Sequence, residues 1–165
     1  MWHVAQMNVG TARYPLDDPR IAEFMGRLDE VNALADTALG FIWRLQSDAG
    51  NATSIKLSDN PLFIVNMSVW ESVESLFDFV YRTSHRSVMV KRRNWFERPD
   101  GAYMVLWWVP AGTIPTPHEG LMRLRWLDQN GPTPYAFDFR SKFPPPDVAG
   151  PSEDMQPQPY CVGWR

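Results

Sequence analysis

Apolar and polar residues alternate along three short stretches of this chain, residues 2–9, 41–46 and 62–70. Successive residues of a strand point to opposite faces of a sheet, so each stretch predicts a strand with one apolar face and one face that carries polar groups. A fourth stretch, residues 102–109, is apolar at nearly every position and predicts a strand with apolar residues on both faces. Together the four stretches predict one sheet.

Apolar residues at helical spacing lie between the predicted strands. An Asp-Pro pair at residues 18–19 predicts the start of a first helix, and Gly40 predicts its end. Ser72 is placed to cap a second helix, which the Thr-Ser pair at 83–84 is expected to interrupt, because short hydroxyl side chains compete for backbone groups. The helix is expected to resume over residues 85–96.

The order strand, helix, strand, strand, helix, strand is the split βαβ pattern of ferredoxin-like folds, which places the chain in the α+β class with an antiparallel sheet. The helices of such a fold would cover one face of the sheet. The other face then needs a cover, and a second copy of the chain is the most economical one. We therefore expect a homodimer.

The last third of the chain predicts a smaller extension. Residues 117–129 predict a capped helix, and residues 135–139 alternate like an edge strand. A short extended run near 54–57 is a further candidate for the sheet. We expect one domain with its extension over residues 1–143, followed by an irregular tail over 144–165, where Pro, Gly, Ser, Asp and Gln dominate.

The composition narrows the classes of function. The chain has 165 residues, about one domain, and its net charge of −3 argues against nucleic acid as a partner, because phosphate binding needs a positive surface. Cys161 is the single cysteine, so no intrachain disulfide and no cysteine-rich zinc site are expected. No apolar run approaches the roughly 20 residues that span a bilayer. The first residues do not read as a signal peptide, so the expected location is the cytoplasm.

Polar side chains recur on one alternating face of the three mixed strands. Burying an amide or hydroxyl group without a partner costs about 1–3 kcal/mol. A sheet face that carries several such groups therefore predicts a lined pocket for a small molecule. The predicted polar lining consists of Gln6, Asn8, Arg44, Gln46, Asn66 and Ser68, and the tryptophans placed to wall the pocket, or else to fill the core, are Trp43, Trp70, Trp107 and Trp108.

Two residues are candidates for catalysis, His85 and Arg44. His85 is flanked by arginines and can exchange a proton near neutral pH, unless it is a helix histidine that bonds to the backbone. Arg44 can bind a carboxylate or a phenolate through its planar fork, unless it pairs with an Asp or Glu from a helix. Asn66 and Ser68 can orient a carbonyl or enolate oxygen, unless water or a partner subunit satisfies them.

The other charged and histidine residues predict no site. His3 is expected at a strand end that faces solvent or a partner subunit, and His118 on the exposed first turn of the late helix. The basic run Lys91–Arg93 is expected to be a solvated helix face, and no metal site is expected. The sequence also contains no phosphate-binding glycine loop, HExxH pair, Ser-His-Asp order or dinucleotide fingerprint, so hydrolase, kinase and dehydrogenase chemistry is not supported.

Several blocks of sequence occur together in one order: HVAQMNVG, PLDDPR, GFIWRLQSD, NMSVWESVESLFDFVYRTSHR and GPTPYAFDF. In these blocks the chain resembles the bacterial family called domain of unknown function 3291, over roughly residues 2–143, with the tail after Pro146 outside it. The resemblance implies the dimeric α/β-barrel superfamily, which includes cofactor-free antibiotic-biosynthesis monooxygenases, haem-degrading monooxygenases and stress-responsive proteins. The family has no assigned activity, so the resemblance implies a fold more than a function.

Haem-degrading members of that superfamily carry an Asn on the first strand and a Trp followed by an iron-ligating His on the second helix. This chain resembles them in Asn8 and His85, but Phe79 stands where the Trp is expected, so the set is incomplete. Three functions stay open. The preferred one is a small-molecule-binding enzyme with acid/base or cofactor-independent monooxygenase-like chemistry; the others are a non-catalytic ligand-binding or stress-related module and a haem-binding protein.

Overall fold

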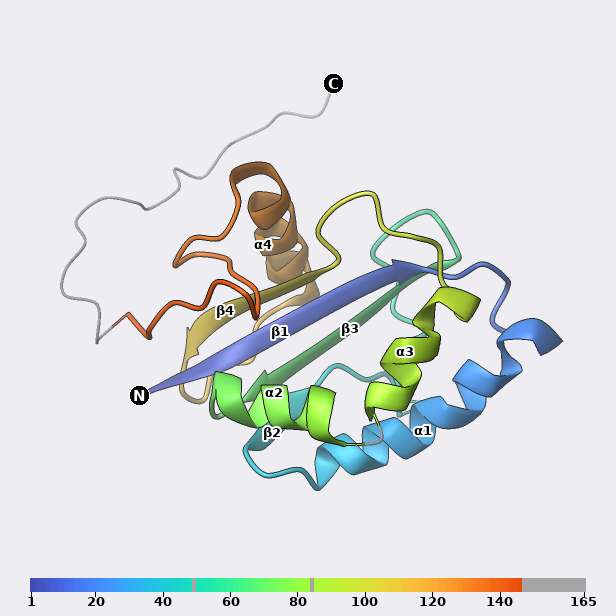
Figure 1. Ribbon diagram of the computed structural model, residues 1–165, viewed down its shortest axis with the longest axis horizontal. Helices are drawn as coiled ribbons and strands as arrows, with labels where there is room; N and C mark the ends of the chain where they lie inside the picture. Colours follow the sequence, from blue (N-terminus) through green and yellow to red (C-terminus); the bar gives the residue numbers. More distant parts are fainter. Residues whose placement is uncertain (49, 84, 147–165) are drawn as a thin grey trace.

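The computed structural model describes residues 1–48, 50–83 and 85–146, the side chains of residues 85–87 excepted (Figure 1). Within these residues the strands are β1 (Trp2–Thr11), β2 (Phe41–Arg44), β3 (Phe63–Trp70) and β4 (Met104–Pro110), and the helices are the short 3-10 helix η1 (Pro19–Ile21), α1 (Ala22–Asp36), α2 (Val73–Arg82), α3 (His85–Trp95) and α4 (Pro117–Asn130). The sheet is antiparallel, in the order β2-β3-β1-β4. This order confirms the predicted ferredoxin-like split βαβ fold.

Hydroxyl side chains mark the helix ends as the sequence predicts. Ser72 Oγ accepts a hydrogen bond from a backbone N–H in the first turn of α2, and Thr116 Oγ1 does the same for α4. The interruption expected at Thr83 is present, because α2 and α3 are separate helices. The Thr83 hydroxyl group donates a hydrogen bond to the Phe79 carbonyl oxygen at this break.

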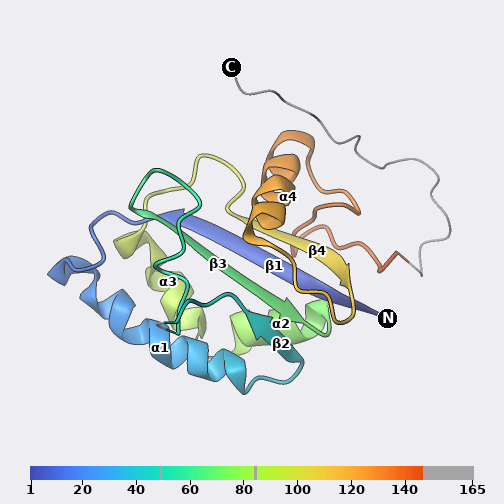
Figure 2. The same cartoon turned by 180° about the vertical axis from the view of Figure 1, so that it is seen from behind.

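The two faces of the sheet belong to separate cores, as the alternation of side chains requires. One core lies between the sheet and the helices α1 and α2, and it includes Val4, Trp70, Leu76, Phe79 and Leu106. The other core lies between the sheet and α4, and it includes Ala5, Met7, Met67, Trp107 and Leu124. Accordingly, α2 and α3 lie on the near side of the sheet in Figure 1, and α4 lies on the near side in Figure 2.

The second face of the sheet is covered by the chain itself, whereas the sequence pattern predicts a second copy as the most economical cover. Ala5, Met7 and Trp107 are fully buried on this face. Gly120 of α4 lies so close to the sheet that a Cβ atom there would be 2.5 Å from Met7 Cε and 3.3 Å from Trp107 Cη2. The predicted late helix is thus the cover. A homodimer stays a prediction. The uncovered sheet face from which it was predicted is not present in the described chain.

Two predicted elements differ from the structure for local reasons. Helix α1 ends at Asp36 rather than at Gly40, and the Thr37 hydroxyl group donates to carbonyl oxygens of the last helical turn. Residues 54–57 form no strand. Just before them, Asn51 Oδ1 accepts a hydrogen bond from the backbone N–H two residues further on, which turns the chain.

The predicted edge strand at residues 135–139 forms one bridge to β4, through Phe137, and one local bridge between Ala136 and Thr133. Phe137 and Leu106 of β4 exchange two backbone hydrogen bonds, of 2.7 and 2.9 Å. Asp138 Oδ1 then accepts hydrogen bonds from the N–H groups of residues 140 and 141, which turns the chain away from β4. The bridge carries the chain around the edge of the sheet, and Phe137 packs in the core on the side of α1 and α2.

Replacing Gly120 with Ala is expected to destabilise the fold by about 1–3 kcal/mol, because the added methyl group must displace Met7 and Trp107 in a filled core. Gly26→Ala is the matched control, since nothing lies within 4 Å of the Cβ position on α1. That change is expected to stabilise the helix by about 0.5–1 kcal/mol. Urea unfolding measures both variants, and equal stability of the two would contradict the packing of α4 on the sheet.

Candidate functional site

Four of the predicted polar residues lie together on the sheet face that α1, α2 and α3 cover. Gln6 of β1 is paired with Ser68 of β3, and Asn8 with Asn66, so all four side chains point to the same side. They line a cavity of about 150 Å³ between the sheet and the helices. Gln6 and Ser68 are buried, whereas Asn66 is exposed.

Apolar side chains from the three helices form most of the remaining wall. Trp70 of β3 adds a further aromatic side chain from the sheet. A dry cavity of about 150 Å³ has room for one aromatic ring. The helix residues of the wall include Phe24, Val31, Phe79, Val88 and Trp95. An apolar wall with a few converging polar groups is the usual make-up of a small-molecule site.

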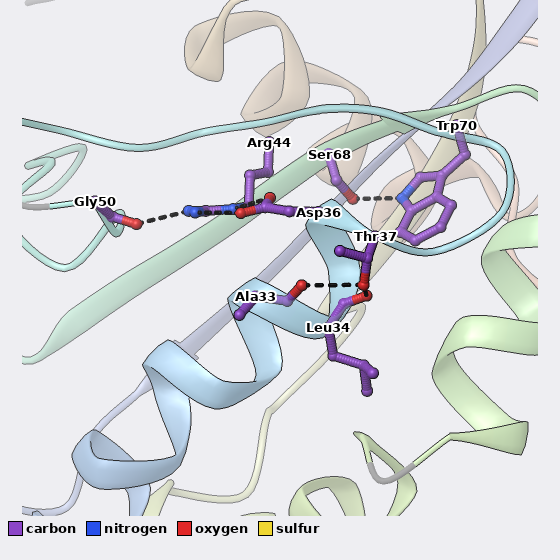
Figure 3. A network of polar contacts seen from close by, with 8 residues as sticks. All are labelled: Ala33, Leu34, Asp36, Thr37, Arg44, Gly50, Ser68 and Trp70. Carbon is purple, nitrogen blue, oxygen red and sulfur yellow. Dashed lines mark hydrogen bonds and ion pairs between the residues drawn. The ribbon is translucent and has the colours of Figure 1, made fainter.

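A chain of hydrogen bonds, here called the relay, joins four residues of this face. The indole Nε1–H of Trp70 donates to Ser68 Oγ at 2.9 Å, as Figure 3 shows. The Ser68 hydroxyl group donates to Gln6 Oε1 at 3.0 Å. Gln6 Nε2 in turn donates to Asn8 Oδ1 at 2.8 Å. The relay satisfies the buried polar groups at the centre of the sheet.

The relay runs in one direction, from the Trp70 indole to Asn8. An indole N–H can donate a hydrogen bond but cannot accept one. Ser68 Oγ therefore accepts from Trp70. Its own hydroxyl group donates to the Gln6 carbonyl oxygen, and the Gln6 amide nitrogen donates onward to Asn8. The carbonyl oxygen of Asn8 is thus used as an acceptor within the relay. The N–H groups of Asn8 Nδ2 can donate to a ligand in the cavity, which Asn8 lines.

Two further amides line the cavity, Asn66 from β3 and Asn32 from α1. Among the described residues neither side chain makes a hydrogen bond, although Asn32 is only 9% exposed. Asn32 is absent from the predicted lining. Its signal in the sequence is spacing, since it follows Leu28 by four residues and precedes Ala35 by three, on the apolar side of a predicted helix.

Arg44 lines the cavity, but its guanidinium group is already occupied (Figure 3). Its Nε and Nη2 atoms bind the two carboxylate oxygens of Asp36 at 2.7 and 3.1 Å, and Nη1 donates to the Gly50 carbonyl oxygen at 2.7 Å. This is the ion pair with a helix acid that stood as the alternative to ligand binding. Arg44 therefore ties β2 to the end of α1, and we do not retain it as a catalytic or ligand-binding residue.

The structure does not bring Trp43 and Gln46 to the cavity. Arg44 pairs with Ser68 and faces the helices, on the face that alternation predicts, whereas its neighbour Trp43 packs on the α4 side. A bulge between Phe41 and Trp43 shifts the register, so that Phe41 pairs with Trp70 and lines the cavity together with Arg44. Gln46 follows the end of β2 and is exposed. A bulge cannot be read from the alternation of apolar and polar residues, so the sequence does not reveal that Phe41 shares the face of Arg44.

The other tryptophans predicted as walls also have structural positions. Trp107 is fully buried in the core on the α4 side. Trp108 lies on the opposite face, where its indole N–H donates to the Phe143 carbonyl oxygen at 2.9 Å. Of these four tryptophans, Trp70 lines the cavity. Its indole also begins the relay.

Arg92 of α3 is half-buried, which corrects the expectation that the basic run Lys91–Arg93 is a solvated helix face. Its Nη2 atom donates to the Val9 carbonyl oxygen of β1 at 2.8 Å, and its guanidinium carbon lies 4.8 Å from the centre of the Tyr103 ring. Burial lowers the pKa of Arg92, and the neighbouring Tyr103 acts on that pKa in the opposite direction. The guanidinium group remains charged at neutral pH.

Gly10 makes room for this arginine. A Cβ atom at Gly10 would lie 2.8 Å from Arg92 Nη2 and 2.8 Å from Phe96 Cδ1. The sequence signal for an inward Arg92 is again spacing, because it follows Val88 by four residues and precedes Trp95 by three. Both of those residues also line the cavity.

Each of the three histidines has a different setting. His85 is the first residue of α3, and its side chain lies outside the described residues. His3 is half-buried on the α4 side of β1, where its Nδ1 atom has no hydrogen-bond partner among the described residues. His118 is exposed on the first turn of α4, as predicted.

A haem group does not fit the cavity. A porphyrin joins four pyrrole rings, whereas a volume of about 150 Å³ accommodates a single ring. Phe79 is buried and stacks on Trp70 with 5.0 Å between the ring centres, so it helps to fill this side of the core. We therefore derive no step through haem.

The part of the chain that the structure describes has no group of three or more His, Cys, Asp or Glu side chains placed to hold a metal ion. No helix in that part combines the length and the apolar character that crossing a membrane requires.

Comparison with solved structures finds remote matches. NE2512, a protein of unknown function from Nitrosomonas europaea, is 13% identical, with 71% of this chain and 96% of that chain covered and a TM-score of 0.44. SnoaB, a cofactor-independent oxygenase from Streptomyces nogalater, is 16% identical, with coverages of 70% and 100% and a TM-score of 0.46. Rv0793 from Mycobacterium tuberculosis is 11% identical, with coverages of 69% and 99% and a TM-score of 0.46. Likeness at this level carries no argument about activity.

Comparison with the curated proteins finds no match. A family model does match, over residues 3–153. This match extends further toward the C-terminus than the region of resemblance, roughly residues 2–143, that the sequence blocks indicate. A match over most of the chain shows the family, and the chain belongs to the family described as a domain of unknown function (DUF3291).

Proposed function

We propose that this chain binds a small molecule that carries one aromatic ring and an oxygen atom able to accept a hydrogen bond. The observation that carries the proposal is the relay, which holds the Asn8 carbonyl oxygen and leaves the Asn8 amide N–H donors for a cavity with aromatic walls. A ring fits the apolar part of this cavity, and its oxygen would face Asn8.

The relay lowers the cost of binding, because Asn8 is already ordered before the ligand arrives. A neutral hydrogen bond contributes about 0.5–1.5 kcal/mol. Burying the ring contributes roughly 25 cal/mol for each Å² of apolar area removed from water. The ring would therefore supply most of the affinity, and Asn8 would select the position of the oxygen. A fragment of this size is expected to bind with a Kd on the order of 1 mM.

A reaction at this site would need a proton acceptor in addition to Asn8. Amide donors aimed at an oxygen can stabilise an enolate or a phenolate. The described lining contains no Asp, Glu, Lys or His. His85 stays the proton acceptor predicted from the sequence, for acid/base or cofactor-independent oxygenase-like chemistry. The lack of a base in the described lining favours, as the second candidate, a module that binds without catalysis.

We propose that one copy of the chain supplies the binding site, because its sheet and three of its helices all contribute to the lining. The cavity is lined by residues of one chain, from the sheet and from α1, α2 and α3. A homodimer, if it forms, would use another surface than the one α4 covers. Binding by the monomer is therefore part of the proposal.

Asn8→Ala is expected to weaken the binding of benzamide by about tenfold, because the amide donors are lost while the apolar wall remains. Benzamide serves as the probe because it joins one ring to a neutral carbonyl oxygen. Isothermal titration calorimetry measures the affinity. Asn94→Ala is the matched control, since Asn94 is an exposed residue of α3. Equal affinities for Asn8→Ala and the control would contradict the role of Asn8, and no binding to the unaltered chain would contradict the pocket itself.

Ser68→Ala is expected to lower the free energy of unfolding by about 2 kcal/mol, because Trp70 Nε1 and Gln6 Oε1 both lose their buried partner. It is also expected to weaken benzamide binding, since Asn8 is then free to turn. Ser54→Ala, at an exposed position, controls for loss of a hydroxyl group. Chemical unfolding and calorimetry give the two readouts, and a change in neither would refute the relay.

His85→Ala is expected to lower turnover by about 10²–10⁴-fold while leaving benzamide affinity unchanged, if His85 acts as general base. Single-ring phenols and enolisable aryl ketones, incubated with the chain under oxygen and followed by mass spectrometry, supply the assay. Benzamide binding without turnover of any of these compounds would assign the chain to the non-catalytic class instead.

A further inference from the structure

The charges around the cavity have one sign. Its described lining contains Arg27, Arg44 and Arg92 but no Asp or Glu. Two of these arginines have a carboxylate partner outside the lining: Arg44 Nε lies 2.7 Å from Asp36 Oδ1, and Arg27 Nη2 lies 3.4 Å from Glu23 Oε1. Glu23 also binds Lys91 Nζ at 2.6 Å, so this carboxylate is shared. Arg92 differs from both, since no carboxylate oxygen of a described residue lies within 4.0 Å of its nitrogens.

Arg92 also has donors to spare. A guanidinium group carries five N–H donors, and one of those nitrogens bonds to the Val9 carbonyl oxygen. The rings of Phe96 and Tyr103 lie 5.2 and 4.8 Å from the guanidinium carbon and hold the group in place. A half-buried cation without a counter-ion is costly, and a fixed planar fork matches the two oxygens of a carboxylate.

We propose that the molecule bound in this cavity is an aromatic carboxylate, and that its carboxylate group pairs with Arg92 while its ring lies between the sheet and the helices. The inference rests on the proposed function, because it names the class of ligand for the same cavity. It transfers to Arg92 the anion-binding role that the sequence suggests for Arg44.

A second cavity, of about 210 Å³, adjoins the first at Arg92 and Tyr103, which line both. Glu97, Arg98 and Asp100 line this second cavity as well, so two carboxylates offset its two arginines. The described lining of the first cavity contains no carboxylate. An anion that approaches Arg92 is therefore favoured on the side of the first cavity, next to the aromatic wall.

Benzoate and benzamide provide the test, because they have nearly the same size and shape and differ in charge. Calorimetry at low ionic strength is expected to show that the unaltered chain binds benzoate about tenfold more tightly than benzamide. In Arg92→Gln the benzoate affinity is expected to fall to that of benzamide, while the benzamide affinity changes by less than about twofold. Arg93→Gln removes the same charge from an exposed neighbour and is expected to keep the preference.

A second variant keeps the test decisive if Arg92→Gln does not fold, which circular dichroism reveals. Arg92→Lys retains the charge but loses the planar fork, and it is expected to reduce the preference for benzoate by about threefold or more. A preference that survives unchanged in the folded Arg92 variant overturns the inference, as does benzamide binding without any preference for benzoate in the unaltered chain. Failure of both compounds to bind overturns the proposed pocket function on which the inference rests.

Discussion

The hydrogen-bond relay from Trp70 to Asn8 is the interaction on which the rest of the site depends. It allows hydroxyl and amide groups to occupy the centre of a buried sheet face, where an unpaired group costs about 1–3 kcal/mol. Its hydrogen bonds run from the Trp70 indole to the Asn8 carbonyl oxygen, and this order leaves the Asn8 amide N–H groups for a ligand. The pairing of β1 with β3 places Gln6 opposite Ser68. The register of the two strands therefore determines which polar groups meet in the site.

The extension after β4 is what makes a pocket within one chain possible. Helix α4 packs on one face of the sheet, with Gly120 against Met7 and Trp107, and so buries an apolar surface that would otherwise need a partner. The other face keeps its polar centre, because α1, α2 and α3 cover its apolar edges and leave a cavity over the relay. The face under α4 therefore stabilises the fold, and the face under α1, α2 and α3 carries the proposed binding site.

Much of the fold and part of the site can be predicted from the sequence, for reasons that particular residues show. Strict alternation in β1 and β3 predicts that Gln6, Asn8, Asn66 and Ser68 share a face, and the structure places them so. Alternation also places Arg44 on this face, but it fails for Phe41, because a bulge between Phe41 and Trp43 brings Phe41 to the face of Arg44. Arg92 shows a different limit, since composition suggests a solvated basic run, whereas its inward position depends on Gly10 of a distant strand and on the rings of Phe96 and Tyr103.

The most direct test of the account is a nuclear magnetic resonance titration of the unaltered chain with benzamide, observed at the side-chain N–H groups. The account predicts that the Asn8 amide signals shift and saturate with benzamide, while the indole signal of Trp70 and the amide signals of Gln6 move little, because their hydrogen bonds are already made. Unmoved Asn8 signals, with saturating shifts at Trp107 on the α4 side instead, would contradict it.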